Sequence, residues 1–162
     1  MAARFAAYRR KRRPAKSGEP KGGRAKGRAQ RFVVQKHDAS RLHYDFRLMI
    51  GGALASWAVP KGPSRSPRAK RLAVRTEDHP PEYASFEGRI PKGEYGAGTV
   101  EIWDRGSYRN LRDASMKQSL REGMIEVGLK GKKLRGGYAL RRIAKGKKAR
   151  WLLIKMKDRH AK

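Results

Sequence analysis

The chain has 162 residues, which is enough for one hydrophobic core but not for two. Its 42 lysines and arginines outnumber 14 acidic residues and give a formal charge of +28. Such a charge repels itself unless a polyanion neutralises it, so nucleic acid is the expected partner. A membrane surface is the alternative, but no long apolar run or basic amphipathic helix supports it.

The chain contains no cysteine, which excludes disulfides, thiolate metal sites and thiol nucleophiles. Any metal must therefore be bound by histidine, aspartate or glutamate. No apolar stretch precedes the first basic cluster, so we expect no secretory signal and a cytoplasmic, nucleoid-associated location. An organelle transit peptide stays open as the alternative, because such peptides are also rich in arginine and poor in acids.

Residues 1–30 differ in composition from the rest of the chain. Pro, Gly, Ala, Lys and Arg dominate, and Glu19 is the only acid. The segment KGGRAKGR at residues 21–28 has too little apolar surface to order itself. We therefore expect a flexible basic arm, which either is solvated or neutralises phosphates.

Short runs of strand-forming residues separated by Gly and Pro follow the arm. The expected strands are residues 31–36, 43–50, 53–59, 71–76, 98–103, 124–129, 138–143 and 150–155. Gly51 and Gly52 predict a two-residue hairpin turn. Residues 114–122, followed by Gly123, form the one longer helical run, and residues 86–98 show little periodicity. The pattern predicts a mostly β domain, a small antiparallel barrel or sandwich of about eight strands with one or two short helices.

The second expected strand alternates without a break between an apolar and a polar face. Its core face consists of Tyr44, Phe46, Leu48 and Ile50, and its other face of His43, Asp45, Arg47 and Met49. Side chains on one face are about 6.5–7 Å apart, so His43 and Asp45 can bind one ion. A short turn can bring His37 back beside His43.

Two histidines and one carboxylate leave coordination positions open, as catalytic metal sites require. This ligand set suits Mn²⁺, Fe²⁺ or Zn²⁺ and does not select among them. The alternative is a polar strand face that simply contacts water. Three of the four histidines lie between residues 37 and 79, and this concentration of ligand-type residues favours the metal site.

Several basic residues and a third histidine could contact a phosphate. Arg47 can donate two parallel hydrogen bonds to phosphate oxygens. Lys61 lies in a loop between two prolines, and Arg71 begins a strand, although either could be surface charge in so basic a chain. His79, in the sequence EDHPP, is expected in a stiff turn. It could donate a proton to a phosphoryl group or pair with a neighbouring carboxylate.

Seven motifs occur in a fixed order from about residue 31 to 158. They are HDASRLHYDFRL (37–48), SWAVPKGPS (56–64), EDHP (77–80), FEG (86–88), IPKGEYGAG (90–98), WDRG (103–106) and WLLIK (151–155). Together they resemble the 3′-phosphoesterase domain of bacterial DNA ligase D. The resemblance divides the chain into the arm (1–30), a phosphoesterase domain (31–158) and a short tail (159–162).

The resemblance implies a compact antiparallel β-barrel enzyme that requires Mn²⁺, or another divalent transition metal. Such enzymes remove a 3′-terminal ribonucleoside and then the remaining 3′-phosphate from DNA during double-strand-break end joining, which leaves a 3′-OH for polymerase and ligase components. The implied metal ligands are His37, His43 and Asp45. The implied phosphate contacts are Arg47, Lys61, Arg71 and His79, with Arg47 and His79 as the catalytic candidates and Gln35, Glu77 and Tyr83 in support.

The arm departs from the pattern of this family. Members carry a sequence like Lys-Arg-Asp-Phe ahead of Glu-Pro, whereas residues 11–14 read KRRP here, with Arg13 in place of the acid. The sequence shows no polymerase or ligase domain, so a free-standing enzyme and a domain of a larger protein both stay open. A basic nucleic-acid-binding module without catalysis is the second candidate function.

Overall fold

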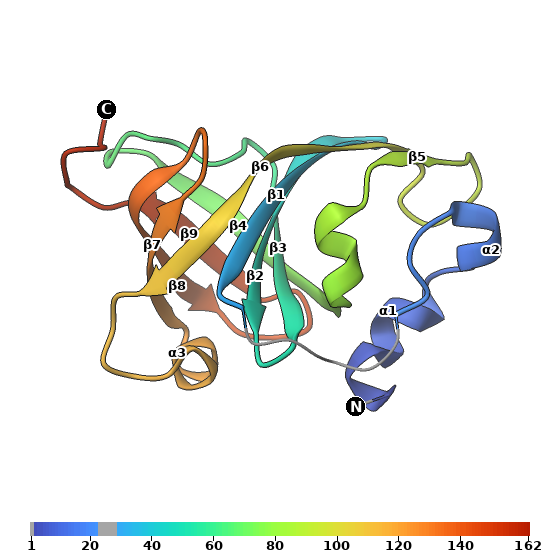
Figure 1. Ribbon diagram of the computed structural model, residues 1–162, viewed down its shortest axis with the longest axis horizontal. Helices are drawn as coiled ribbons and strands as arrows, with labels where there is room; N and C mark the ends of the chain where they lie inside the picture. Colours follow the sequence, from blue (N-terminus) through green and yellow to red (C-terminus); the bar gives the residue numbers. More distant parts are fainter. Residues whose placement is uncertain (1, 23–28) are drawn as a thin grey trace.

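The structure is a computed structural model and describes residues 2–22 and 29–162. Eight antiparallel strands close into a barrel, and a ninth short strand extends it at one edge (Figure 1). In spatial order the barrel strands are β1 (Arg31–Asp38), β2 (Leu42–Ile50), β3 (Ala53–Val59), β4 (Lys70–His79), β9 (Arg150–Lys155), β8 (Arg135–Ala144), β7 (Met124–Lys130) and β6 (Gly98–Asn110). Pairing of β1 with β6 closes the ring, and β5 (Gly88–Ile90) pairs with the first three residues of β6. The predicted barrel is confirmed.

The alternation of β2 puts its apolar side chains into the barrel. Phe46, Leu48 and Ile50 are buried in the main core with Trp57 and Trp151, and Tyr44 packs against that core. A strand of period two must then turn its other side chains outward. The outward face of β2 is also covered, because the arm and the helix after β4 pack over it.

The predicted turn chemistry is confirmed. Gly51 and Gly52 join β2 to β3 with φ values of 60° and 83°, which the hairpin requires and glycine adopts without strain. The expected helix is α3 (Met116–Glu122), two residues shorter at its start because Ser115 caps it by accepting a hydrogen bond from the Gln118 amide. It ends at Gly123, as predicted.

Several strand boundaries differ from the prediction. The strand expected at residues 98–103 continues to Asn110, the one expected at 138–143 spans Arg135–Ala144, and the first strand continues to Asp38. The strand expected at residues 71–76 continues to His79, because Leu54 of β3 still pairs with His79, so this histidine ends a strand instead of lying in a turn. Within the segment of little periodicity at residues 86–98, three residues form β5, which pairs with β6. Neither pairing depends on local periodicity, which explains why the sequence did not predict it.

The N-terminal residues also differ from the expected flexible arm. Residues 2–22 include three short helices, η1 (Ala2–Phe5), α1 (Ala6–Arg10) and α2 (Pro14–Ser17), which lie on the same side of the barrel as η2 (Pro81–Ser85), drawn in green in Figure 1. Phe5 and Tyr8 are fully buried in a second apolar cluster outside the barrel. Most of the KGGRAKGR segment, residues 23–28, lies outside the described residues.

Among the described residues, no helix combines the length and the apolar character needed to cross a membrane.

Candidate active site

The two histidines expected to bind metal face each other across the first hairpin. His37 of β1 pairs with His43 of β2, and their ring centroids are 4.8 Å apart. The antiparallel register produces this contact, since the hairpin turns back at residues 39–41. The proximity predicted from the sequence is confirmed.

Asp45 completes the cluster from the next position on the same face of β2. Its Oδ2 lies 3.6 Å from Nδ1 of His37 and 3.3 Å from Nε2 of His43. One ligand atom from each residue lies within 4.8 Å of the other two. Asp45 is buried and the histidines are partly buried, so the cluster is shielded but reachable.

The remaining nitrogens of both histidines contact backbone carbonyls. Nε2 of His37 lies 2.6 Å from the oxygen of Gly96, and Nδ1 of His43 lies 3.0 Å from that of Arg41. A carbonyl only accepts, so these nitrogens carry the hydrogen. In the neutral rings, the nitrogens that face Asp45 then have free lone pairs, which is the arrangement of metal-binding histidines. The cluster therefore fits a divalent metal.

Arg47, one step further along β2, is buried beside the cluster. Its Nε donates to Oε1 of Gln35 at 2.7 Å, and its guanidinium lies over the Tyr83 ring at 4.9 Å. Its Nη2 lies 3.5 Å from Oδ2 of Asp45. Its Nη1 is buried and has no hydrogen-bond partner among the described residues. An unsatisfied buried donor of this kind is available to a ligand.

Gln35 holds this arrangement in place from behind. Its Nε2 donates to the carbonyls of Tyr83 and Phe86 at 2.8 and 3.0 Å. The same amide thus orients Arg47 and fixes η2 against β1. Gln35 is fully buried and does not line the cavity described below.

The charges in the cluster shift its proton equilibria. Burial would raise the pKa of Asp45, but the Arg47 charge and the contacts with His37 and His43 hold this pKa well below its usual range. Burial would lower the pKa of His43, but the hydrogen bond and charge of Asp45 raise it. Metal binding at His43 therefore competes with a proton.

His79 has the opposite environment. Burial, with the charges of Arg47 and Arg12, lowers its pKa well below the ordinary value, so its ring is neutral at neutral pH. Its Nδ1 donates to the Glu77 carbonyl at 2.9 Å, and its Nε2 accepts from Arg12 Nη2 at 3.2 Å.

Arg12 is a site residue that the sequence analysis did not single out. It reaches in from the N-terminal arm, pairs with Glu19 at 3.0 Å and with Glu77 at 2.9 Å, and its side chain is 6% exposed. The signal that could have indicated it is the Lys-Arg pair at residues 11–12, which matches the Lys-Arg of the family pattern. In a chain with 42 basic residues, one arginine among neighbouring basic residues does not stand out.

These side chains surround one cavity of about 190 Å³. Its lining consists of Arg12, Glu19, His37, Ala39, His43, Asp45, Arg47, Thr76, Glu77, His79, Tyr83, Ile90, Tyr95 and Gly96. Besides Arg47 Nη1, two further polar atoms of lining residues, Oε1 of Glu19 and Oγ1 of Thr76, are buried without a hydrogen-bond partner in residues 2–22 and 29–162. Three of the residues that line this cavity thus each carry an unsatisfied buried polar atom, and such groups are frequent at ligand sites.

The structure does not bring all the predicted residues into this cavity. Seven of them line it: His37, His43, Asp45, Arg47, Glu77, His79 and Tyr83. Gln35 lies behind Arg47, as described. Lys61 and Arg71 line a separate surface hollow, where Arg71 donates to the Lys61 carbonyl at 3.0 Å. They are adjacent to each other but do not surround the metal-binding atoms.

A closed antiparallel barrel with a two-histidine, one-carboxylate cluster beside a buried arginine defines a class of protein, the small β-barrels with a candidate phosphoester site. The profile described as the DNA ligase D 3′-phosphoesterase domain matches residues 35–142. The chain belongs to this family.

Several relatives extend over almost the whole chain. The multifunctional non-homologous end joining protein LigD of Pseudomonas aeruginosa is 50% identical over 162 residues. The LigD proteins of Mycobacterium tuberculosis and Mycolicibacterium smegmatis are 44% and 45% identical over 160 and 164 residues. Each alignment covers 98% of this chain but only 19%, 20% and 21% of the respective relative. The chain thus spans about a fifth of the length of these relatives.

Proposed function

We propose that the chain is a Mn²⁺-dependent phosphoesterase that processes DNA 3′ ends during double-strand-break end joining. It would remove a 3′-terminal ribonucleoside and a 3′-phosphate and work in the cytoplasm, at the nucleoid. The observation that carries the proposal is the single cavity in which the His37, His43 and Asp45 cluster adjoins the free Nη1 of Arg47. The family, and the names of the relatives as end joining proteins, support DNA as the substrate.

In this proposal Nδ1 of His37, Nε2 of His43 and Oδ2 of Asp45 hold the metal. A bound divalent ion supplies Lewis-acid polarisation of a phosphate oxygen and a lowered pKa of water. Nitrogen and carboxylate ligands suit Mn²⁺ and also other divalent transition metals. The ionised state of Asp45 and the backbone contacts of the histidines prepare these atoms in advance.

Arg47 would bind the phosphate and stabilise the charge that develops on it. Its guanidinium is fixed by Gln35 and Tyr83, so little reorganisation accompanies the reaction. Arg12 faces the same cavity and would contribute a second positive charge. Two buried arginines that converge on one small cavity suit an anionic group such as a phosphate.

His79 would contact the phosphate and donate the proton to the leaving oxygen, which is the DNA 3′-oxygen in the phosphatase step and the 5′-oxygen of the ribonucleoside in the diester step. In the unliganded cavity its ring is neutral and its Nε2 accepts from Arg12. A bound phosphate adds negative charge close to the ring and takes up the Arg12 charge, and both effects raise the pKa of His79. Protonation of Nε2 would accompany substrate binding.

Lys61 and Arg71 would bind a DNA phosphate next to the scissile one. Their position outside the cavity lining supports a contact with the backbone instead of the reacting group. The partners in this proposal are DNA 3′ ends and the polymerase and ligase activities that use the 3′-OH product.

A nucleic-acid-binding module without catalysis would also account for the charge of +28. It does not account for three metal-ligand side chains within 4.8 Å of one another in a cavity with unsatisfied polar atoms. A Mn²⁺ titration separates the two, because the module without catalysis has no stoichiometric metal site.

The experiment that tests the proposal compares DNA ends. Primer–templates with a 3′-phosphate, a 3′-ribonucleoside or a 5′-phosphate are incubated with the chain and Mn²⁺. We expect processing of both 3′ ends and no release of the 5′-phosphate. Absence of phosphate release from the 3′-phosphate end at any Mn²⁺ concentration would refute the proposal. Release of the 3′-phosphate alone would restrict it to the phosphatase step, in a chain that carries Arg13 where the family has an acid.

A further inference from the structure

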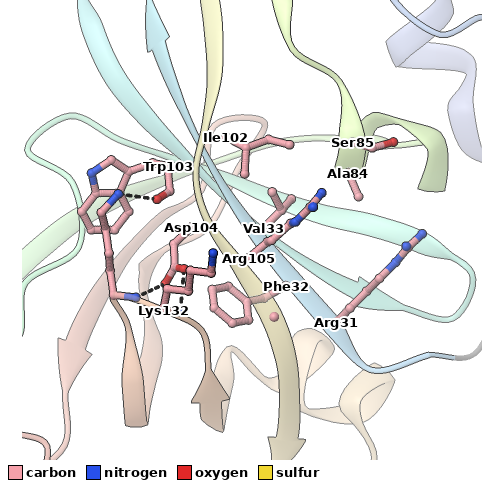
Figure 2. Close-up of a pocket in the computed structure, with 12 residues that line it drawn as sticks. Arg31, Phe32, Val33, Ala84, Ser85, Ile102, Trp103, Asp104, Arg105 and Lys132 are labelled. Carbon is pink, nitrogen blue, oxygen red and sulfur yellow. Dashed lines mark hydrogen bonds between the residues drawn. The ribbon is translucent and has the colours of Figure 1, made fainter.

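A second and larger hollow lies on the outside of the barrel, over β1 and β6 and beside η2 (Figure 2). We call it the outer groove; its volume is about 650 Å³. Four of its lining residues are cationic: Arg31, Arg105, Lys132 and Lys133. It shares no lining residue with the cavity of the metal cluster.

An extra residue in β6 shapes the outer groove. Gln35 of β1 pairs with Ile102, and the preceding Val34 pairs with Asp104, so Trp103 has no partner on β1. Such a bulge shifts the alternation of the strand by one residue. Ile102 packs against the second apolar cluster outside the barrel. Ile102 and Arg105 both line the groove, although an odd spacing of three residues would put them on opposite faces of a regular strand.

A buried carboxylate fixes the loop between β7 and β8 at the rim of the groove. Asp104 accepts hydrogen bonds from the backbone amides of Lys132, Lys133 and Leu134 at 2.9, 3.1 and 2.8 Å. The backbone of Lys132 and Lys133 is thereby held at the rim, and neither side chain forms an ion pair with Asp104. The Asp104 carboxylate accepts from backbone amides and not from the ammonium groups of the two lysines.

The cations of the groove lack acidic partners, in contrast to those of the arm. Within residues 2–22 and 29–162, no carboxylate pairs with Arg31, Arg105, Lys132 or Lys133. Lys133 lies 4.8 Å from the Trp103 ring and donates to its carbonyl, and Arg105 and Lys132 are exposed. Unneutralised cations around a concave surface are suited to a chain of phosphates.

The outer groove lies on the same face of β1 as the metal cluster. Val33, Gln35 and His37 are alternate residues of β1 and so point to the same face. Val33 lines the groove, and His37 belongs to the metal cluster. Four residues of strand extend about 13 Å, at about 3.3 Å each. Duplex DNA covers that length in about four nucleotides, with a rise of about 3.4 Å per nucleotide.

We propose that the outer groove binds the phosphodiester backbone of DNA a few nucleotides away from the processed 3′ end. The position of that end rests on the proposed function, whereas the binding of backbone phosphates does not. Arg31, Arg105 and Lys132 are the side chains that would contact phosphates. The backbone could belong to the processed strand or to its complement.

The test neutralises two exposed groove cations whose side chains make no hydrogen bond to any residue that the structure describes, in the double variant Arg105→Gln/Lys132→Gln. The matched control is Lys147→Gln/Lys148→Gln, which removes the same charge from an exposed turn at the other end of β8. Affinity for a fluorescent duplex with a recessed 3′-phosphate, and for the same strand alone, is measured across salt concentrations with EDTA present. Hydrolysis of thymidine 3′-monophosphate with Mn²⁺ reports the metal cavity separately.

We expect the groove variant to lose affinity for the duplex on the order of tenfold per lost contact at 0.1 M salt, with its salt slope reduced by about 0.9 for each. The change in the logarithm of duplex affinity should be less than about a third as large in the control as in the groove variant. Loss on both DNAs assigns the groove to the processed strand, and loss on the duplex alone assigns it to the complement. Equal losses in the groove variant and the control would overturn the proposal. Because binding is measured without metal, the proposal for the groove can be tested even if the proposed phosphoesterase activity is absent.

Discussion

The guanidinium of Arg12 donates a hydrogen bond of 2.9 Å to the carboxylate of Glu77. This contact joins the N-terminal arm to β4 and places a basic residue from the arm in the same cavity as His37, His43 and Asp45. The arm is therefore part of the site. Phe5 and Tyr8 anchor the arm in the second apolar cluster, and Arg12 lines the cavity.

Arg12→Ala should destabilise the protein and lower its activity. The substitution removes the ion pair of buried Glu19 and leaves Glu77 with Lys11 alone, and the loss of one member of a buried pair costs about 3–5 kcal/mol. Urea denaturation measures the free energy of unfolding. Lys16→Ala, an exposed position on α2, serves as the control and should change stability by less than about 0.5 kcal/mol. Equal stability of both variants would show that the arm does not depend on Arg12.

Gly98→Ala should distort the strand pair that carries His37. A Cβ at residue 98 would lie 2.1 Å from the backbone oxygen of Asp38, and φ there is +137°. Gly146 is the matched control, because its φ is +126° but nothing lies within 4 Å of its Cβ position. We expect Gly146→Ala to cost about 1 kcal/mol from backbone strain and Gly98→Ala clearly more, with weakened Mn²⁺ binding. A smaller cost at Gly98 than at Gly146 would contradict this packing.

Gln35→Leu should cost stability and activity together. Leucine has about the same size but cannot accept from Arg47 Nε or donate to the carbonyls of Tyr83 and Phe86. Each unsatisfied buried group costs about 1–3 kcal/mol. We also expect a higher KM for a 3′-phosphate substrate, since Arg47 loses its orientation. Steady-state kinetics beside urea denaturation check both effects, and an unchanged KM in the folded variant would show that Gln35 does not position Arg47.

Stability should fall in mild acid because of His79. Its pKa in the folded protein is well below the ordinary value of 6.5, mainly through burial and then through the charges of Arg47 and Arg12. Between these two pKa values the unfolded chain binds more protons than the folded one. The stabilising contribution of neutral His79 is therefore fully present above about pH 6.5, and the free energy of unfolding decreases as the pH falls below this value. The raised pKa of His43 acts in the opposite direction, with a contribution present at low pH and lost as the pH rises.

The variant His79→Gln separates these two effects. It removes one titration and leaves His43 in place, so its free energy of unfolding should fall less steeply than that of the wild type from pH 6.5 to 5. The difference in slope should approach about 1.4 kcal/mol per pH unit, the value for one proton. Parallel pH profiles of the two proteins would mean that His79 is not held neutral by the fold.

The sequence predicted the parts of the fold that rest on local pattern. Alternation in β2 placed Phe46 in the core and Asp45 on the opposite face, and the register of a short hairpin brought His37 to His43. These features depend on strand period and turn length, which are visible in the residues themselves.

The rest depends on contacts between distant residues. Tyr8 and Arg12 are ordered by Pro20, Glu19 and Glu77, and no local pattern in a basic segment indicates this. Lys61 and Arg71 were grouped with the site by family resemblance, whereas the geometry of the strand ends places them in a separate hollow. The bulge at Trp103, which shapes the outer groove, is a pairing irregularity between β1 and β6 and has no periodic signature.

The most direct test of the proposed metal centre is the Mn²⁺ dependence of phosphate release from a 3′-phosphate primer–template, compared between the wild type and Asp45→Ala. Asp45 supplies the carboxylate of the cluster, so the variant should show a rate lower by about a hundredfold, the upper end of the loss typical even for groups that only support metal ligands, at every Mn²⁺ concentration and with its barrel retained by circular dichroism. His37→Ala should behave in the same way. Undiminished Mn²⁺-dependent phosphate release by either folded variant would contradict the assignment of these residues as the metal centre.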